Sequence, residues 1–200
     1  MNSDAGLIYR RGLNLRDDYF QHFAPLKLKD GFSLVTQVLH PYSRGYITLK
    51  NRNPLEKPLI FSRFFSDQRD IQTMLEGVKL SLDLVQKSKA FKKFGVNFYA
   101  KPNPACAQFQ YMSDDYWECI IRHFSYITYH DVGTCKMGPN PGEDVVNSRL
   151  QVHGVDNLRV ADASIMPNLV SANTQASCYV IGEKASDMIL EDRYYRLKMK

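Results

Sequence analysis

The stretch SDQRDIQTMLEGVKLSLDLVQKSKAF, Ser66 to Phe91, is the part of the chain whose pattern is plainest. Its apolar residues recur three or four positions apart, the spacing of one face of a helix. They are Ile71, Met74, Leu75, Val78, Leu82 and Val85. Asp67 and Asp70 stand near its start, where helix-capping residues are favoured. The stretch predicts a long amphipathic helix.

The residues before this helix have the pattern of strands. FSLVTQVLHPYSRGYITLKN, residues 32–51, alternates apolar and polar positions on either side of a segment with Pro41, Ser43 and Gly45, which supply turn chemistry. We expect two strands joined by a loop. PLIFSRFF, residues 58–65, predicts a further short strand.

The residues after it predict two more helices with strands between them. SDDYWECIIRHFSYITY, residues 113–129, begins with Ser113 as an N-cap and places apolar residues on an inner face. Residues 145–167 predict two short strands around a turn at 153–157. A final helix follows in SANTQASCYVIGEKASDMILED, residues 171–192, with Asn173 as its cap. Strands first and helices after indicate an α+β fold, an antiparallel or mixed sheet with covering helices, followed by a β-turn-β-helix piece.

The first turn of this final helix carries no charged residue, since Thr174, Gln175, Ala176 and Ser177 follow Asn173. Helix N-termini expose unpaired amide protons and a partial positive charge. Asn173 and water could satisfy these amides, or an anionic or electron-accepting ring oxygen could bind there.

Composition excludes several classes of protein. The 200 residues carry a net charge of +5, and no stretch approaches the roughly 20 apolar residues of a membrane span. The only basic-aromatic cluster, KSKAFKKFG, suits a helix C-terminus better than a nucleic-acid surface. The four cysteines show no CxxC or paired-histidine spacing, so we expect no structural metal; Cys106 and Cys119 could pair if the protein is exported.

His130, in YHDVGTCKMG, could be a base, a metal ligand or a packed core residue. A phosphohydrolase metal site would need further histidine and aspartate ligands that are not evident. A serine hydrolase would need a GxSxG elbow, which the sequence lacks. The sequence also has no GxGxxG or GxxxxGK[ST], the loops that bind nucleotide phosphates.

Three motifs taken together resemble a known family. YHDVGTCKMGP, VVNSRLQVHGVDNLRVADASIMPNLVSANTQAS and IGEKASDMILED, in this order, closely resemble the C-terminal signature of the glucose-methanol-choline (GMC) oxidoreductases, most of all their insect glucose-dehydrogenase-like members. These are FAD-dependent enzymes that oxidise alcohols. Weaker resemblance extends back through HPYSRGYITLKNRNPLEKPLI to the family's substrate-binding region.

The resemblance implies roles for particular residues. His130 matches the family's active-site base and Asn173 its second substrate-binding residue, while Asp162, Ala163, Thr174 and Gln175 match segments that lie along FAD. An ordinary imidazole titrates near pH ~6.5 and can accept a hydroxyl proton, whereas a carboxamide holds the same oxygen without titrating. The implied partners are a small alcohol or sugar substrate and a quinone or oxygen as electron acceptor, without nucleic acid or a membrane span.

The resemblance also implies that this chain is a C-terminal third, because the glycine-rich nucleotide-binding segment of the family is missing from it. We therefore expect four parts: a lead segment 1–30, a substrate-binding region 31–128, the signature 129–192, which completes an FAD-binding domain, and a basic tail 193–200. The alternative is a non-catalytic fragment that acts as a binding or interaction module. The family favours an extracellular location, although the first residues show no signal peptide.

Overall fold

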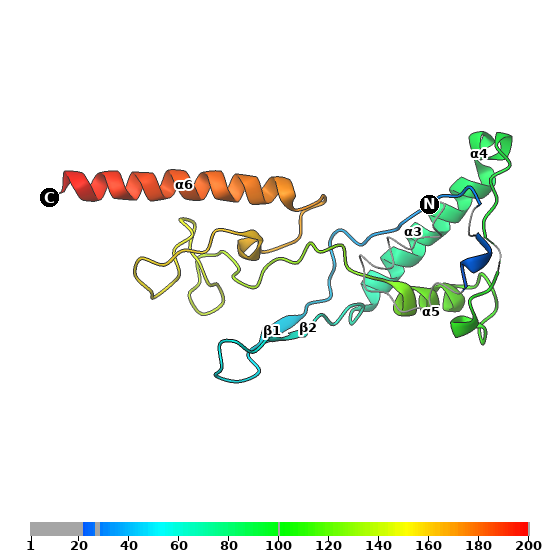
Figure 1. The fold of residues 1–200 in the computed structure, drawn as a ribbon, viewed down its shortest axis with the longest axis horizontal. Coiled ribbons are helices and arrows are strands. Elements are labelled where there is room, and N and C mark those ends of the chain that lie inside the picture. The colour runs from blue at the N-terminus through cyan, green and yellow to red at the C-terminus, as the bar shows by residue number, and fades with distance from the viewer. Residues whose placement is uncertain (1–21, 27–28, 100, 200) are drawn as a thin grey trace. The chain divides into compact units, whose positions relative to one another are not determined.

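The computed structural model describes residues 22–26, 29–99 and 101–199 (Figure 1). The described chain forms two compact units. The first unit consists of the described part of Met1–Val38 together with Asp67–Tyr126, and the second of Leu39–Ser66 together with Ile127–Lys200. No helix among the described residues is both long enough and apolar enough to cross a membrane.

The first unit is helical, with α3 (Gln68–Lys87), α4 (Lys89–Lys93) and α5 (Asp114–Phe124), and two short 3₁₀ turns, η1 (Ala24–Leu26) and η2 (Pro104–Cys106). Both predicted helices form. The Asp67 side chain accepts a hydrogen bond from the Arg69 amide, and the Ser113 side chain accepts one from the Tyr116 amide, so each expected cap satisfies an amide that the helix itself cannot.

The core of the first unit is formed by α3 and α5, which contact each other and each bury one apolar face. Its buried side chains are Ile71, Leu75, Val85, Tyr116, Trp117 and Ile121. A disulfide between Cys106 and Cys119 joins η2 to α5 and is also buried. The pairing that the sequence left open is therefore present in the structure.

The sheet belongs to the second unit and has two antiparallel strands, β1 (Tyr46–Thr48) and β2 (Leu59–Phe61). Tyr46 pairs with Phe61, and their rings stack with centroids 4.7 Å apart. Gly45 lets the strands approach, because a Cβ there would lie 2.3 Å from the Phe61 carbonyl oxygen. The described residues thus combine helices with one small antiparallel sheet, which confirms the α+β prediction in that part.

Two strand predictions were wrong. Residues 29–45 contain no strand, because this apolar stretch has no neighbouring strand in the described chain with which to form a ladder. The two strands expected within residues 145–167 are reduced to isolated bridges, Val146 with Val152 and Gln151 with Arg159. Turns interrupt the pairing here, so the segment folds as a compact series of loops that ends in η3 (Ala163–Ile165).

The core of the second unit forms between these loops and α6 (Gln175–Lys198), which is one continuous helix (Figure 1). Val146, Leu150, Ile165 and Ala185 are buried together, and Met137, Val152, Val160, Ile181 and Met188 pack against them. The basic residues expected as a tail continue the helix to Lys198.

Ion pairs hold α6 against the loops. Arg149 Nη2 lies 2.8 Å from Asp192 Oδ1 and 3.1 Å from Glu191 Oε2, and Arg159 also pairs with Asp192. Burial raises the pKa of Asp192, but the charges and hydrogen bonds of the two arginines outweigh it, so the pKa of Asp192 is lowered. The carboxylate therefore stays ionised between two cations.

The cap of α6 differs from the prediction. Thr174, not Asn173, is the N-cap residue, and its side chain makes no capping hydrogen bond. The Asn173 carboxamide faces His130 instead. The expected absence of acidic residues in the first turn is confirmed.

Candidate active site

The site centres on His130, whose two ring nitrogens both have partners from the segment that begins α6. His130 Nε2 lies 3.1 Å from Asn173 Oδ1, and His130 Nδ1 lies 3.1 Å from Thr174 Oγ1. Asn173 is exposed, His130 is half-buried, and Thr174 is only 7% exposed. Two segments more than 40 residues apart in sequence therefore converge on one imidazole.

The backbone before and after His130 has two left-handed residues. Tyr129 has φ of +58°, a conformation that costs about 1 to 3 kcal/mol in a residue other than glycine. Gly133 has φ of +87°, and a Cβ there would lie 3.2 Å from the Met166 carbonyl oxygen. The GT turn of the motif thus needs glycine both for its conformation and for its close approach to the neighbouring chain.

Hydrogen bonds join the rest of the motif to η3, and an ion pair joins it to Asp144 in the loop after the motif. The amides of Cys135 and Met137 donate to the carbonyl oxygens of Ser164 and Ile165, both at 2.9 Å. Lys136 Nζ also lies 2.9 Å from Asp144 Oδ1. The hydrogen bond to Lys136 holds the pKa of Asp144 below its ordinary value and raises the pKa of Lys136, so both groups stay charged.

Two residues that sequence reasoning missed hold the loop in front of Asn173. His40 Nε2 lies 2.6 Å from Ser171 Oγ, and Arg44 Nη2 donates to Asn168 Oδ1 at 3.2 Å. Both come from the HPYSRG stretch, which the sequence indicated as turn chemistry and as part of a region with weak resemblance to the family, without assigning a role to either residue. Their partners lie more than 120 residues away, so no local pattern could have identified them.

The remaining predicted site residues have local hydrogen bonds. Asp162 Oδ1 accepts from the Ser164 amide at 2.8 Å and so caps η3. Gln175 Nε2 donates to the Tyr179 hydroxyl at 3.4 Å, one turn further along α6. Asp162 and Gln175 are exposed and Ala163 is half-buried. The structure thus brings together His130, Asn173 and Thr174, while the contacts of Asp162 and Gln175 are with their own sequence neighbours.

The partners of His130 suit a ring that accepts and releases a proton. In the neutral ring one nitrogen donates and the other accepts, and both nitrogens donate once the ring is protonated. The Thr174 hydroxyl can donate to Nδ1 or accept from it. The Asn173 oxygen beside Nε2 only accepts, so in this arrangement Nε2 carries the proton of the neutral ring and the Thr174 hydroxyl donates to Nδ1. If a substrate hydroxyl takes the place of that oxygen and Thr174 accepts from Nδ1–H, the lone pair lies on Nε2. The arrangement thus places an imidazole beside a carboxamide.

Comparison with known proteins gives the family. A family model described as GMC oxidoreductase matches residues 41–182, which is most of the chain. The chain is 42% identical over 153 residues to glucose dehydrogenase [FAD, quinone] of Drosophila pseudoobscura pseudoobscura, covering 76% of this chain and 24% of that protein. It is also 42% identical over 181 residues to alcohol dehydrogenase [acceptor] of Pseudomonas putida, covering 84% of this chain and 31% of that protein.

Solved structures agree. A formate oxidase variant of Aspergillus oryzae RIB40 matches with a TM-score of 0.67 and 34% identity over 76% of this chain and 26% of that one. A fungal aryl-alcohol oxidase matches with a TM-score of 0.65 and 32% identity over 78% of this chain and 25% of that one. The chain thus spans between about a quarter and a third of the length of these relatives. It belongs to the GMC oxidoreductase family.

Proposed function

We propose that this chain forms the catalytic and substrate-side portion of an FAD-dependent oxidoreductase that oxidises the CH–OH group of an alcohol or a sugar. One observation carries the proposal: the imidazole of His130 and the carboxamide of Asn173 lie 3.1 Å apart although they come from separate segments. A base and a neutral hydrogen-bonding group side by side are what the removal of a hydroxyl proton requires.

The start of α6 suits a flavin in its chemistry. The Thr174 side chain makes no capping hydrogen bond and the first turn has no acid, so the amides there remain available to an electron-rich group. When bound, FAD supplies the acceptor for the hydride that leaves the carbinol carbon. We propose that Thr174 and Gln175 lie along the edge of its ring, that Asp162 and Ala163 lie along its chain, and that residues 129–192 complete the domain that binds it.

Residues of this chain then bind the substrate hydroxyl and accept its proton. Asn173 donates a hydrogen bond from its amide nitrogen to the alcohol oxygen and so positions it. His130 accepts the hydroxyl proton at Nε2 while the adjacent C–H bond breaks. When the substrate hydroxyl replaces the Asn173 oxygen beside Nε2, the ring proton lies on Nδ1 and the Thr174 hydroxyl, 3.1 Å from Nδ1, accepts from it. This bond keeps the lone pair on Nε2 before the proton moves and stabilises the imidazolium afterwards.

The names of the relatives support an alcohol or sugar substrate, and the glucose dehydrogenases among them are named with a quinone. The names include glucose dehydrogenase [FAD, quinone], alcohol dehydrogenase [acceptor] and an aryl-alcohol oxidase. We propose the same substrate class for the protein that contains this chain, with a quinone or oxygen as acceptor.

Flavin reduction under anaerobic conditions tests the proposal. In an FAD-loaded polypeptide that contains this segment, His130→Gln should slow flavin reduction by an alcohol donor about 10²- to 10⁴-fold, because the base is lost, with little change in flavin retention. His153→Gln is the matched control: His153 lies 3.0 Å from the Gly138 carbonyl oxygen and should not affect the rate. Equal loss of flavin and rate in His130→Gln would instead indicate a structural role and contradict the proposal.

A further inference from the structure

A second group of chemically active side chains lies in the first unit and shares no residue with the His130 site, which belongs to the second unit. The Cys106 and Cys119 sulfurs and one ring nitrogen of His123 all lie within 4.8 Å of one another. Cys119 and His123 are four residues apart on α5, so they project from adjacent turns of one face. Cys106, the third residue of the cluster, lies in η2. The N-cap residue of η2, Asn103, accepts a hydrogen bond from the Ala105 amide and so holds the turn that contains Cys106.

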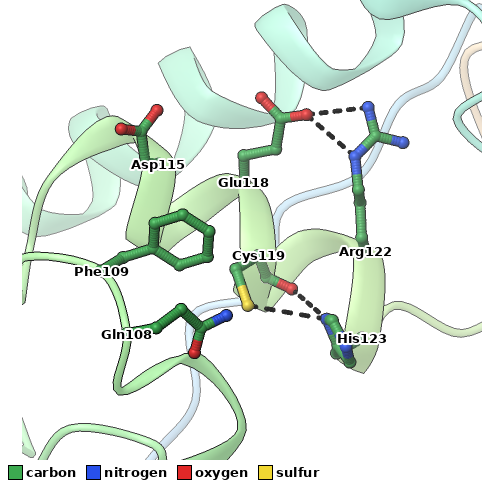
Figure 2. A pocket seen from close by; sticks show the side chains of 7 residues that line it. All are labelled: Gln108, Phe109, Asp115, Glu118, Cys119, Arg122 and His123. Atoms are coloured by element: carbon green, nitrogen blue, oxygen red, sulfur yellow. Dashed lines mark hydrogen bonds and ion pairs between the residues drawn. The ribbon is translucent and has the colours of Figure 1, made fainter.

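One ring nitrogen of His123 lies beside the sulfur and the carbonyl oxygen of Cys119, although the side chain is exposed (Figure 2). Its Nδ1 lies 3.6 Å from Cys119 Sγ and 2.9 Å from the Cys119 carbonyl oxygen. In a tetrahedral zinc site with Zn–S of about 2.3 Å and Zn–N of about 2.05 Å, a sulfur and a nitrogen ligand are about 3.6 Å apart. This pair therefore already has the separation that zinc would impose.

The cluster is reached from a cavity of about 420 Å³. Cys119 and His123 line it, together with Gln108, Phe109, Asp115, Glu118 and Arg122 (Figure 2). Glu118 is paired with Arg122 at 2.8 Å, so its charge is directed along the helix surface. Cys106 is fully buried and Cys119 is 7% exposed, whereas His123 is exposed. An ion would therefore enter on the side of His123.

We propose that reduction of the Cys106–Cys119 disulfide converts this cluster into a zinc site whose protein ligands are the two thiolates and His123 Nδ1. A dithiol reductant supplies two electrons and two protons. The Cys106–Cys119 S–S bond breaks, both cysteines become thiols, and the reductant is oxidised to a disulfide. Zn²⁺ then binds both sulfurs, and the two thiol protons pass to solvent. In the structure Nδ1–H donates to the Cys119 carbonyl oxygen. On metal binding this hydrogen bond breaks, the Nδ1 proton passes to solvent while Nε2 takes one up, and the Nδ1 lone pair binds the metal.

Charge and ligand chemistry favour zinc. Two thiolates in a buried position are costly unless a cation neutralises them, and Zn²⁺ cancels both charges. Thiolate and imidazole are the ligands that zinc prefers, and three protein ligands leave a fourth position, facing the cavity, for water. The sulfurs must separate to about 3.8 Å, which rotation about the Cα–Cβ bonds permits. The sulfurs thus cannot bind zinc while they form the disulfide, and they can bind it after reduction.

Cobalt serves as the spectroscopic probe for the test. The parent is the 200-residue chain with Cys135→Ser and Cys178→Ser, which removes the two free cysteines. After reduction and gel filtration under argon it should bind one Co²⁺ with a thiolate-to-cobalt charge-transfer band, and Zn²⁺ should displace the cobalt. The oxidised chain should show no band. His123→Ala should weaken binding at least about 100-fold, because losing even an outer-shell partner costs 10- to 100-fold.

His22→Ala is the matched control, since His22 also belongs to the first unit but contacts Phe23 and Tyr99. It should bind cobalt like the parent. Circular dichroism is recorded on every sample, because reduction could unfold α5. Regain of helical signal on adding metal would support the proposal. Absence of the band, no regain of lost helix, or equal affinity in His123→Ala and His22→Ala would each overturn it.

Discussion

Thr174→Val removes one hydroxyl from the partner of His130 and leaves the rest of the site in place. The replacement has nearly the same shape, and because the Thr174 side chain makes no capping hydrogen bond, α6 should keep its start. A neutral hydrogen bond contributes about 0.5 to 1.5 kcal/mol and one to a charged group about 1.5 to 3. When His130 takes up a proton, the hydrogen bond from Nδ1–H to the Thr174 Oγ1 changes from a neutral bond to a bond made by a charged group.

The loss specific to the transition state is therefore about 1 to 1.5 kcal/mol, which corresponds to about a five- to thirteenfold slower proton transfer. The assay is anaerobic flavin reduction by an alcohol in an FAD-loaded polypeptide that contains this segment, with flavin absorbance as the check on retention. Thr174→Ser keeps the hydroxyl and should stay within about twofold of the parent. A Thr174→Val rate equal to that of the parent, or a Thr174→Ser rate as low as that of Thr174→Val, would refute the role given to this hydroxyl.

Three further outcomes test the fold. Ile165→Ala should lower the free energy of unfolding in urea by about 2 to 5 kcal/mol, because Ile165 is 4% exposed and its loss leaves a cavity, whereas Ile189→Ala, 49% exposed, should change it by about 0.5 kcal/mol at most. The Arg69 side chain holds the pKa of Asp67 at about 2, below its ordinary value, so the stabilisation is complete above pH ~4 and is lost as pH falls toward ~2. Urea unfolding at several pH values should therefore show a shallower acid loss for Asp67→Asn than for the parent. Intact mass after alkylation should show two modified cysteines without reductant and four with it, since Cys106 and Cys119 are linked.

Each of these has an outcome that would count against the structure. Equal destabilisation by the two isoleucine substitutions would mean that the second unit lacks its described core. If the free energy of unfolding of Asp67→Asn fell with pH as steeply as that of the parent, the ion pair between Asp67 and Arg69 would not contribute to stability. Four alkylated cysteines without reductant would show that the disulfide is absent.

The two capped helices of the first unit could be predicted because their signals are local. Asp67 and Ser113 each bond an amide within three residues, and the apolar spacing of α3 fixes which face is buried. Strands were predicted less well, since a strand exists only where another one pairs with it. Residues 32–38 have strand-like alternation but no ladder in the structure.

In the candidate site, too, features with a local signal could be predicted from the sequence, and contacts between distant residues could not. The sequence by itself determined the family and pointed to His130, Asn173 and Thr174, because their motifs are contiguous and chemically distinctive. Only the tertiary structure decided that Thr174 caps α6, that its hydroxyl bonds His130, that His40 and Arg44 hold the loop before Asn173, and that His123 faces a buried disulfide. These contacts join residues up to 131 positions apart or depend on side-chain direction, and both follow from the packing of the whole unit rather than from any local pattern.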